Sequence, residues 1–241
     1  MFDALRVWSR RLRNVLRVPV VCRNWPEVLC WLFRITRGLP RPASGVVRMR
    51  QGVDVEVRLQ HALDIGSVLE VFGERVYMPL HRSLSPAATV IDVGSSIGDF
   101  VVSLRNSDVA QVLAVDPDAS VAPMFRRNVE NNGMDDRVTL INAVVGTGSW
   151  DVPSVTLDEL FERFGVERCA LLKVDCEGGE YELFRSASSG ILARVDYIFM
   201  ECHRRAGDEF ERLYDRLEGE RFQIRGGGWN VHNVRLLHAW R

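Results

Sequence analysis

The sequence TVIDVGSSIGDFVVSL, residues 89–104, decides the fold of this protein. The apolar residues around Asp92 predict a buried strand over 89–93, and a second apolar run near the end predicts a helix. Between them lies a turn of small residues, with Gly94, Ser96 and Gly98 at alternate positions. Such a turn lets a ligand approach the backbone and offers it the amides at the start of the helix. The stretch therefore predicts the first strand-turn-helix unit of a ligand-binding sheet.

The same alternation of strand and helix continues towards the C-terminus. Strands are predicted at 111–115, 138–142, 170–175 and 195–201, followed by a helix over 208–219 and a hairpin formed by 221–225 and 232–238. Strands that alternate with helices at this spacing are typical of a doubly wound parallel sheet. We therefore predict an α/β domain with a doubly wound, Rossmann-like sheet over residues 85–241.

Residues 1–84 have a different pattern and are predicted to form an extension of that domain. Helical spacing over 5–16 predicts one helix, and Pro26 in a first turn with Gly38 as the C-cap predicts a second from about 24 to 38. Residues 46–50 and 53–59 are predicted to form a β-hairpin around Gln51-Gly52, since apolar and charged residues alternate in the second of these strands. We expect this N-terminal helical and β-hairpin extension to act as a lid, a dimer element or a substrate element.

Charge and composition limit the classes of protein that fit. The 241 residues include 46% apolar and 26% charged residues, which is typical of one folded domain with a small appendage. Residues 1–41 hold nine arginines against Asp3 and Glu27, whereas the whole chain has a formal charge of −1. The acidic main body argues against a nucleic-acid partner. The basic leader makes contact with an anionic membrane surface an alternative to the lid, and its tryptophans make a homodimer plausible.

No apolar run near the N-terminus approaches the roughly 18 residues of a transmembrane helix, and no signal-peptide pattern is present. The five cysteines are odd in number and form no C-x-x-C pair, which argues against a disulfide framework and a zinc site. We expect a cytoplasmic protein.

Three classes of protein use a glycine-rich turn of this kind. The dinucleotide-binding motif G-x-G-x-x-G is not met, because Ser96 stands where its middle glycine would be. Residues 94–98 match the G-x-S-x-G motif of serine hydrolases, with Ser96 as nucleophile and His203 or His232 as base, but no oxyanion segment precedes them. The third class binds S-adenosylmethionine and needs an acid at the end of the next strand, where Asp116 stands.

Asp116 follows Asp92 by 24 residues, and its carboxylate would accept hydrogen bonds from the ribose hydroxyls. The plainer alternative is that Asp116 only begins the turn at Pro117. The segment beginning with Asn142 and Ala143 would lie beside the adenine ring. The combination with the glycine-rich turn favours the S-adenosylmethionine site.

Polar residues end the fourth and fifth predicted strands. Lys173, Asp175 and Glu177 stand at every second position, so they share one face if the chain is extended there. Lys173 is the only lysine of the chain, and an ion pair with either acid is the structural alternative. Glu201 and His203 end the next strand, and histidine suits the removal of a proton from a hydroxyl. We predict these five residues as the catalytic group, with Glu177 and His203 as candidates for the base. Asp175 with Glu201 offers oxygen ligands for Mg²⁺, but we expect no metal.

The order of these segments resembles the FkbM-type family of S-adenosylmethionine-dependent methyltransferases over about residues 85–205. The segments are VIDVGSSIGDF (90–100), AVDPD (114–118), TLINAVVG (139–146), SVTLDEL (154–160), LLKVDCEGGEYE (171–182) and VDYIFMECH (195–203). The resemblance implies the class I Rossmann-like methyltransferase fold and methylation of hydroxyl groups on sugars or polyketide-type natural products.

Site residues carry over from the resemblance by position. Asp92, Gly94, Ser96 and Gly98 match the cofactor motif, Asp116 the ribose-binding acid, and Asp175 with Glu177 the acidic pair near the reacting methyl group. The family often has Asn in place of Ser96 and Glu in place of Asp116, which questions the affinity for the cofactor more than its identity. A binding protein that keeps the fold without catalysis is the remaining alternative, and the intact acids argue against it.

Overall fold

The computed structural model describes residues 15–74, 84–146, 151–205, 209–230 and 233–241, which fall into two compact units. The hairpin unit comprises the described part of residues 1–83 together with 96–107 and 120–136. The sheet unit comprises 84–95, 108–119 and the described part of 137–241. The hairpin unit therefore contains two stretches from beyond the predicted boundary at residue 84.

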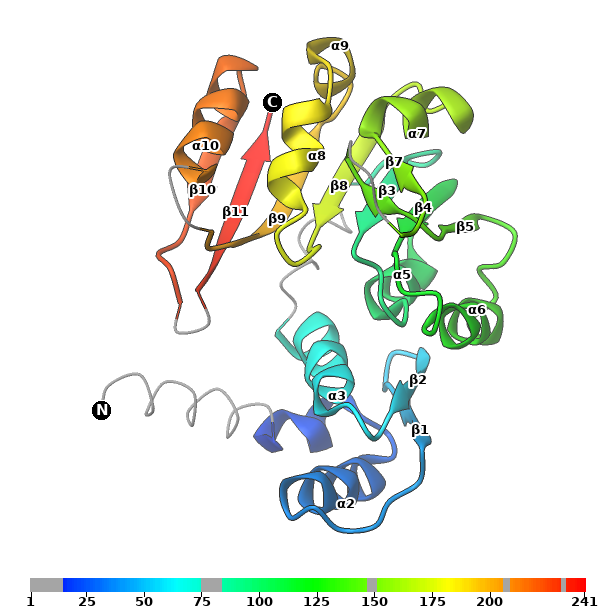
Figure 1. Ribbon diagram of the computed structural model, residues 1–241. Helices are drawn as coiled ribbons and strands as arrows, with labels where there is room; N and C mark the ends of the chain where they lie inside the picture. The colour runs from blue at the N-terminus through cyan, green and yellow to red at the C-terminus, as the bar shows by residue number, and fades with distance from the viewer. Residues whose placement is uncertain (1–14, 75–83, 147–150, 206–208, 231–232) are drawn as a thin grey trace. The chain divides into compact units, whose positions relative to one another are not determined.

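The sheet unit is built on seven strands in the order β10-β11-β9-β8-β3-β4-β5 (Figure 1). Their bounds are β3 Thr89–Val93, β4 Gln111–Val115, β5 Val138–Ile141, β8 Cys169–Val174, β9 Tyr197–His203, β10 Gln223–Gly226 and β11 Val234–Trp240. Strands β9, β8, β3, β4 and β5 are parallel, and β11 pairs antiparallel with both β9 and β10. The predicted doubly wound sheet is confirmed.

The direction of strand order reverses beside β3. The chain runs from β3 through β4 to the edge strand β5, and then returns to β8 on the other side of β3. In open α/β sheets, ligands bind outside the carboxyl ends of the strands at such a switch point. Asp92 in β3 is paired in register with Lys173 in β8, so two predicted site residues flank this point.

Helices of the sheet unit cover an apolar core. They are α7 Leu157–Arg163, α8 Glu180–Ser186, α9 Ser189–Leu192 and α10 Glu209–Gly219, and α8 lies beside α10 over the sheet (Figure 1). Helix α7 begins with a capping box, in which the N–H of Glu159 donates to the side chain of Thr156 and the N–H of Thr156 donates to the side chain of Glu159. The buried faces of these helices meet apolar residues of the central strands, including Ile91, Leu172 and Ile198.

The hairpin unit contains the predicted β-hairpin between helices. Its elements are α2 Trp25–Thr36, β1 Ser44–Arg48, β2 Asp54–Arg58, α3 Ala62–Leu69, α5 Asp99–Ser103 and α6 Ala122–Asn131, with a π-helical turn over Glu70–Glu74 and a 3₁₀ turn over Leu104–Asn106. Val55 and Val57 are fully buried, whereas their neighbours in β2 are partly exposed, as the alternating pattern predicts. The first predicted helix lies mostly outside the described residues, of which 15–21 are helical.

Strands were predicted more accurately than short elements. The predictions at 89–93 and 111–115 agree with β3 and β4 residue for residue. Three short elements were not predicted, because an element of so few residues is too short to show a clear hydrophobic period. They are the helix α3 and the paired strands β6 Val144–Val145 and β7 Ser154–Val155. Among the described residues, no helix combines the length and apolar character needed to cross a membrane.

Candidate functional site at the carboxyl edge of the sheet

The only lysine of the chain lies at the switch point and is buried. Its Nζ is 3.0 Å from Oδ1 of Asp92, which is also fully buried, and it donates a hydrogen bond of 3.1 Å to the carbonyl of Gly94. Lys173 thus joins the end of β3 to the glycine-rich turn that follows. This partner differs from Asp175 and Glu177, the two acids that the sequence suggested for an ion pair.

The beginning of the glycine-rich turn is packed against neighbouring strand ends. Gly94 has a φ of +83°, and a Cβ placed on it would overlap the carbonyl oxygen of Asp175. The N–H groups of Gly94 and Ser95 both donate to the carbonyl of Val115, at 2.8 and 3.2 Å. Only glycine fits this position, because a side chain would be both strained and blocked. Close passage of bare backbone is what a cradle for a nucleoside ligand requires.

The turn continues into the hairpin unit with Ser96 and Gly98, both of which have left-handed backbone conformations. Ser96 has a φ of 45° and Gly98 a φ of 82°. A Cβ on Gly98 would lie 2.9 Å from the ring of Phe125 in α6, so the second glycine is also required by its surroundings. The two glycines that sequence analysis singled out are therefore constrained by backbone geometry and by packing.

Asp116 directly follows β4 and takes part in the local turn. Its Oδ1 accepts a hydrogen bond of 2.9 Å from the N–H of Asp118, which closes the turn around Pro117. The side chain of Asn142 donates to the carbonyl of Asp116 at 2.9 Å. The structure therefore contains the turn that was the alternative reading of Asp116. A cleft of about 740 Å³ borders Asn142 and Ala143, and its other walls come from β5, β7 and α7.

Acidic side chains surround His203 at the ends of β8 and β9. Nε2 of His203 lies 3.4 Å from Oε2 of Glu177 and 4.0 Å from Oδ1 of Asp175. Nδ1 lies 3.4 Å from Oε1 of Glu180. One ligand atom each from Asp175, Glu201 and His203 fall within 4.8 Å of one another. Four of the five predicted catalytic residues thus gather at one point of the sheet edge.

Glu180 is the member of this group that the sequence analysis did not assign. Its carboxylate is fully buried and accepts hydrogen bonds from the N–H of Gly178 at 2.8 Å and of His203 at 2.6 Å. The next residue, Tyr181, donates its hydroxyl to the carbonyl of His203 at 2.7 Å. The first turn of α8 therefore holds the end of β9. An acid directly after Gly178-Gly179 at a helix start was the signal available in the sequence.

Glu180 also sets the charge of the histidine. Its carboxylate, with smaller contributions from Glu177 and Asp175, raises the pKa of His203 to about 9 against the opposing effect of burial. His203 is therefore an imidazolium at neutral pH, with Nε2 carrying a proton towards Glu177 and Asp175. In this state the imidazole cannot accept another proton.

The predicted extended arrangement of Lys173, Asp175 and Glu177 is wrong at its last residue. Strand β8 ends at Val174, and Glu177 has a φ of 52° in the turn that follows. The guanidinium of Arg205 packs against the same turn, because a Cβ on Gly178 would lie 2.6 Å from its Nε. As a result the side chain of Glu177 is 89% exposed, whereas that of Lys173 is buried. The period of two stops where the chain leaves the sheet.

A parallel sheet in this strand order, with polar residues gathered at the switch point, defines a Rossmann-like fold of the class I methyltransferase type. Solved structures similar to this chain include the methyltransferase domain of METTL16 (14% identity, TM-score 0.55, covering 77% of this chain and 72% of that chain). Another is an O-methyltransferase from Bacillus cereus in complex with S-adenosylhomocysteine (12% identity, TM-score 0.50, covering 70% and 80%). At these identities the likeness concerns the fold.

Sequence comparison finds similarity over part of the chain. Residues 144–224 match the family model described as the methyltransferase FkbM domain, which confirms the resemblance over that segment. The ribosomal protein L11 methyltransferase of Chloroflexus aurantiacus is 28% identical over 95 residues, or 39% of this chain. The chain spans only 29% of the length of that relative.

Proposed function

We propose that this protein is an S-adenosylmethionine-dependent methyltransferase that methylates a hydroxyl group of a sugar, a glycan or a natural product. The observation that carries the proposal is the group of carboxylates around His203, at the ends of β8 and β9. This group lies beside the glycine-rich turn, in which Gly94 packs on Asp175. The methyltransferase family match over residues 144–224 and the class I fold support the reaction type.

S-adenosylmethionine is the cofactor, and the residues of the sheet edge suit its chemistry. When bound, it supplies an electrophilic methyl group on a positively charged sulfonium. The carboxylates of Asp175 and Glu177 offer the complementary negative charge. Asp116 would accept hydrogen bonds from the ribose hydroxyls, and Asn142 and Ala143 would border the adenine. The backbone of Gly94, which has no side chain, would allow the cofactor to approach closely.

Proton removal falls to a carboxylate in this arrangement. His203 carries its own proton at neutral pH, so its positive charge would hold the carboxylate of Glu177, which lies 3.4 Å from Nε2. Glu177, with its exposed carboxylate, would take the proton that the acceptor hydroxyl loses. Asp175 and Glu201 hold the acceptor in line, which is the larger part of the expected rate enhancement.

A hydroxyl acceptor is favoured by the resemblance and by the charge of the main body. An acidic main body repels the phosphates of a nucleic acid, so a small molecule or a glycan is the more suitable partner. The relative that is named for a ribosomal protein acceptor resembles only 39% of the length of this chain. The preference for a hydroxyl over other acceptors is therefore to be tested by offering candidate acceptors directly.

We propose that no metal takes part, although Asp175, Glu201 and His203 are close enough to share an ion. Methyl transfer should therefore survive dialysis against EDTA. Loss of turnover in EDTA, restored by Mn²⁺ or Mg²⁺, would show instead that the three residues form a metal site.

Calorimetric titration with S-adenosylhomocysteine, with NAD as the control, tests the cofactor site. We expect micromolar affinity for the first ligand and no binding of the second. Asp116→Ala should weaken binding by about 10–100-fold, because a charge-assisted hydrogen bond is lost. Binding of neither ligand, together with fluorophosphonate labelling that Ser96→Ala abolishes, would favour the hydrolase alternative.

Transfer of a labelled methyl group from S-adenosylmethionine then tests the acceptor class. Glycans and glycosylated natural products are offered in parallel with RNA and with amine-bearing analogues of any active acceptor. Labelling of hydroxyl acceptors alone supports the proposal. Labelling of RNA or of an amine in preference to the hydroxyl compound would overturn the assignment of O-methylation.

A further inference from the structure

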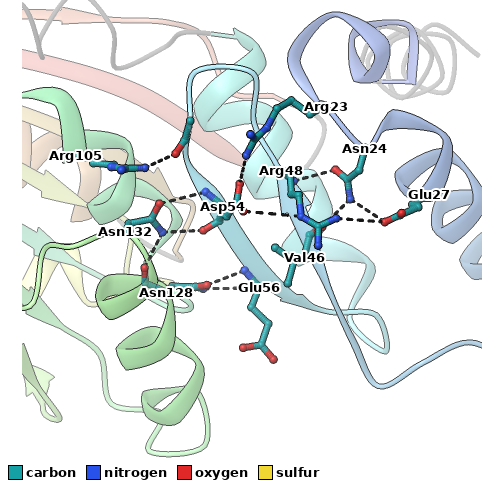
Figure 2. Close-up of polar contacts among 11 residues, drawn as sticks. Arg23, Asn24, Glu27, Val46, Arg48, Asp54, Glu56, Arg105, Asn128 and Asn132 are labelled. Atoms are coloured by element: carbon teal, nitrogen blue, oxygen red, sulfur yellow. Dashed lines mark hydrogen bonds and ion pairs between the residues drawn. The ribbon is translucent and has the colours of Figure 1, made fainter.

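Asparagine side chains occupy both outer edges of the β1–β2 hairpin (Figure 2). On the β1 side, Asn24 accepts from the N–H of Arg48 at 2.9 Å and donates to the carbonyl of Val46 at 2.8 Å. On the β2 side, two asparagines of α6 and its C-terminal end take the same role. A two-stranded hairpin would otherwise present open edges to other strands. Side chains here supply the hydrogen bonds that a neighbouring strand would make.

The match between α6 and β2 follows from their repeats. Asn128 bonds the N–H and carbonyl of Glu56 at 2.7 and 3.0 Å, and Asn132 bonds those of Asp54 at 3.1 and 2.7 Å. Four residues along a helix rise about 6.0 Å, and two residues along a strand rise about 6.6 Å. The two carboxamides therefore fall in register with alternate residues of β2. An ion pair between Arg127 and Glu56 at 2.7 Å strengthens the same contact.

Asn128 differs from Asn132 in the use of its second amide hydrogen. Nδ2 of Asn128 also donates to the carbonyl of Ile97 at 2.8 Å, whereas Nδ2 of Asn132 donates to the backbone of Asn128 at 2.7 Å. Ile97 stands between Ser96 and Gly98 in the glycine-rich turn. Asn128 is fully buried, and both its hydrogens and its oxygen are bonded. One carboxamide thus ties strand β2 to the turn.

The turn depends on such support because its backbone is unfavourable. Ser96 adopts a left-handed conformation that residues with a side chain rarely take. Phe125, one helical turn before Asn128, packs against Gly98. Helix α6 therefore fixes the turn by one apolar and one polar contact, and β2 fixes the orientation of the polar one.

We infer that Asn128 is a positioning residue for the cofactor turn, and that hairpin strand β2 keeps it in place. The hairpin is then part of the support of the cofactor site, a role different from the lid or dimer element expected of residues 1–84. This inference rests on the proposed function, which makes residues 94–98 the cofactor turn.

Two matched substitutions test it. Asn128→Asp and Asn132→Asp each remove two donated hydrogen bonds and place a carboxylate in the same buried contact between α6 and β2. Only the first removes the bond to Ile97. We expect Asn128→Asp to weaken binding of S-adenosylhomocysteine by about tenfold or more, and Asn132→Asp by less than about threefold. Equal affinities in the two variants would overturn the inference.

Hydrogen exchange of the amides of residues 96–99 gives a second reading that needs no ligand. Exchange should be faster in Asn128→Asp than in Asn132→Asp or the unsubstituted protein. The proteins are compared at denaturant concentrations that give them equal free energies of unfolding. If that contrast holds while the unsubstituted protein binds no S-adenosylhomocysteine, the positioning role stands and the proposed function fails. Equal exchange in both variants would overturn the positioning role. Asn128→Ser replaces Asn128→Asp in both measurements if the latter does not fold.

Discussion

Glu180 shows how much one buried side chain determines in this site. It accepts from two backbone N–H groups and lies beside the ring of His203, so it fixes both the position and the charge of that residue. The sequence pointed to His203 as a base, whereas its raised pKa makes it a donor at neutral pH. The role of the base passes to Glu177, and this assignment stays a prediction.

Glu177→Gln tests that role, because glutamine keeps the shape of the side chain and loses its ability to take a proton. We expect turnover to fall by about 100-fold or more, with affinity for S-adenosylhomocysteine changed by less than about threefold. Glu218→Gln, at an exposed glutamate of α10, is the control and should leave both quantities unchanged. Retained turnover in Glu177→Gln would remove this residue from the mechanism.

The raised pKa of His203 also predicts how stability varies with pH. The folded-state pKa of about 9 lies above the ordinary value of 6.5, so the stabilisation is complete below about pH 6.5 and is lost as the pH rises through about 9. Between these limits the free energy of unfolding should fall by about 1–3 kcal/mol. Urea unfolding at pH 6.5 and 9.5 measures the change. His203→Gln should flatten it, and an unchanged slope in that variant would contradict the assignment.

At the scale of elements, a buried ion pair links strands β3 and β8. Lys173 and Asp92 face each other across adjacent strands, and Lys173 also holds the turn at Gly94. Such a pair contributes little by itself, but removal of one partner leaves an uncompensated charge in the core. The pair therefore specifies how the strand ends and the turn are arranged.

Lys173→Met should lower the free energy of unfolding by about 3–5 kcal/mol, because it leaves Asp92 buried without its cation. Thermal and urea unfolding give the value. The double variant Lys173→Met with Asp92→Asn should recover part of the loss, since no charge then remains. A loss in the single variant below about 1 kcal/mol would mean that solvent reaches the pair.

At the scale of the whole molecule, the exposed apolar residues of the hairpin unit favour a partner. Leu16, Val20 and Phe33 are 65%, 69% and 55% exposed, and an interface between two copies would remove this apolar area from water. We expect a homodimer, measured by light scattering after size-exclusion chromatography. Phe33→Ser should shift the protein towards the monomer. A monomeric protein that sediments with anionic vesicles would instead support the membrane contact.

The sequence by itself determined the sheet, most of its strands and the set of polar residues at its edge. Strand periodicity and the glycine-rich turn are local signals, so β3, β4 and the order of site residues were predicted from neighbours in the chain. The resemblance in LLKVDCEGGEYE then indicated the family whose domain model matches residues 144–224.

Only the tertiary structure decided which of these residues are partners. Lys173 bonds Asp92, 81 positions away, and Glu180 reaches His203 from a different element, because the topology brings the ends of β3, β8, β9 and α8 together. The bonds of Asn128 to Glu56 and Ile97 likewise join distant segments. Charge state, exposure and the choice of base depend on such contacts, which no period along the chain records.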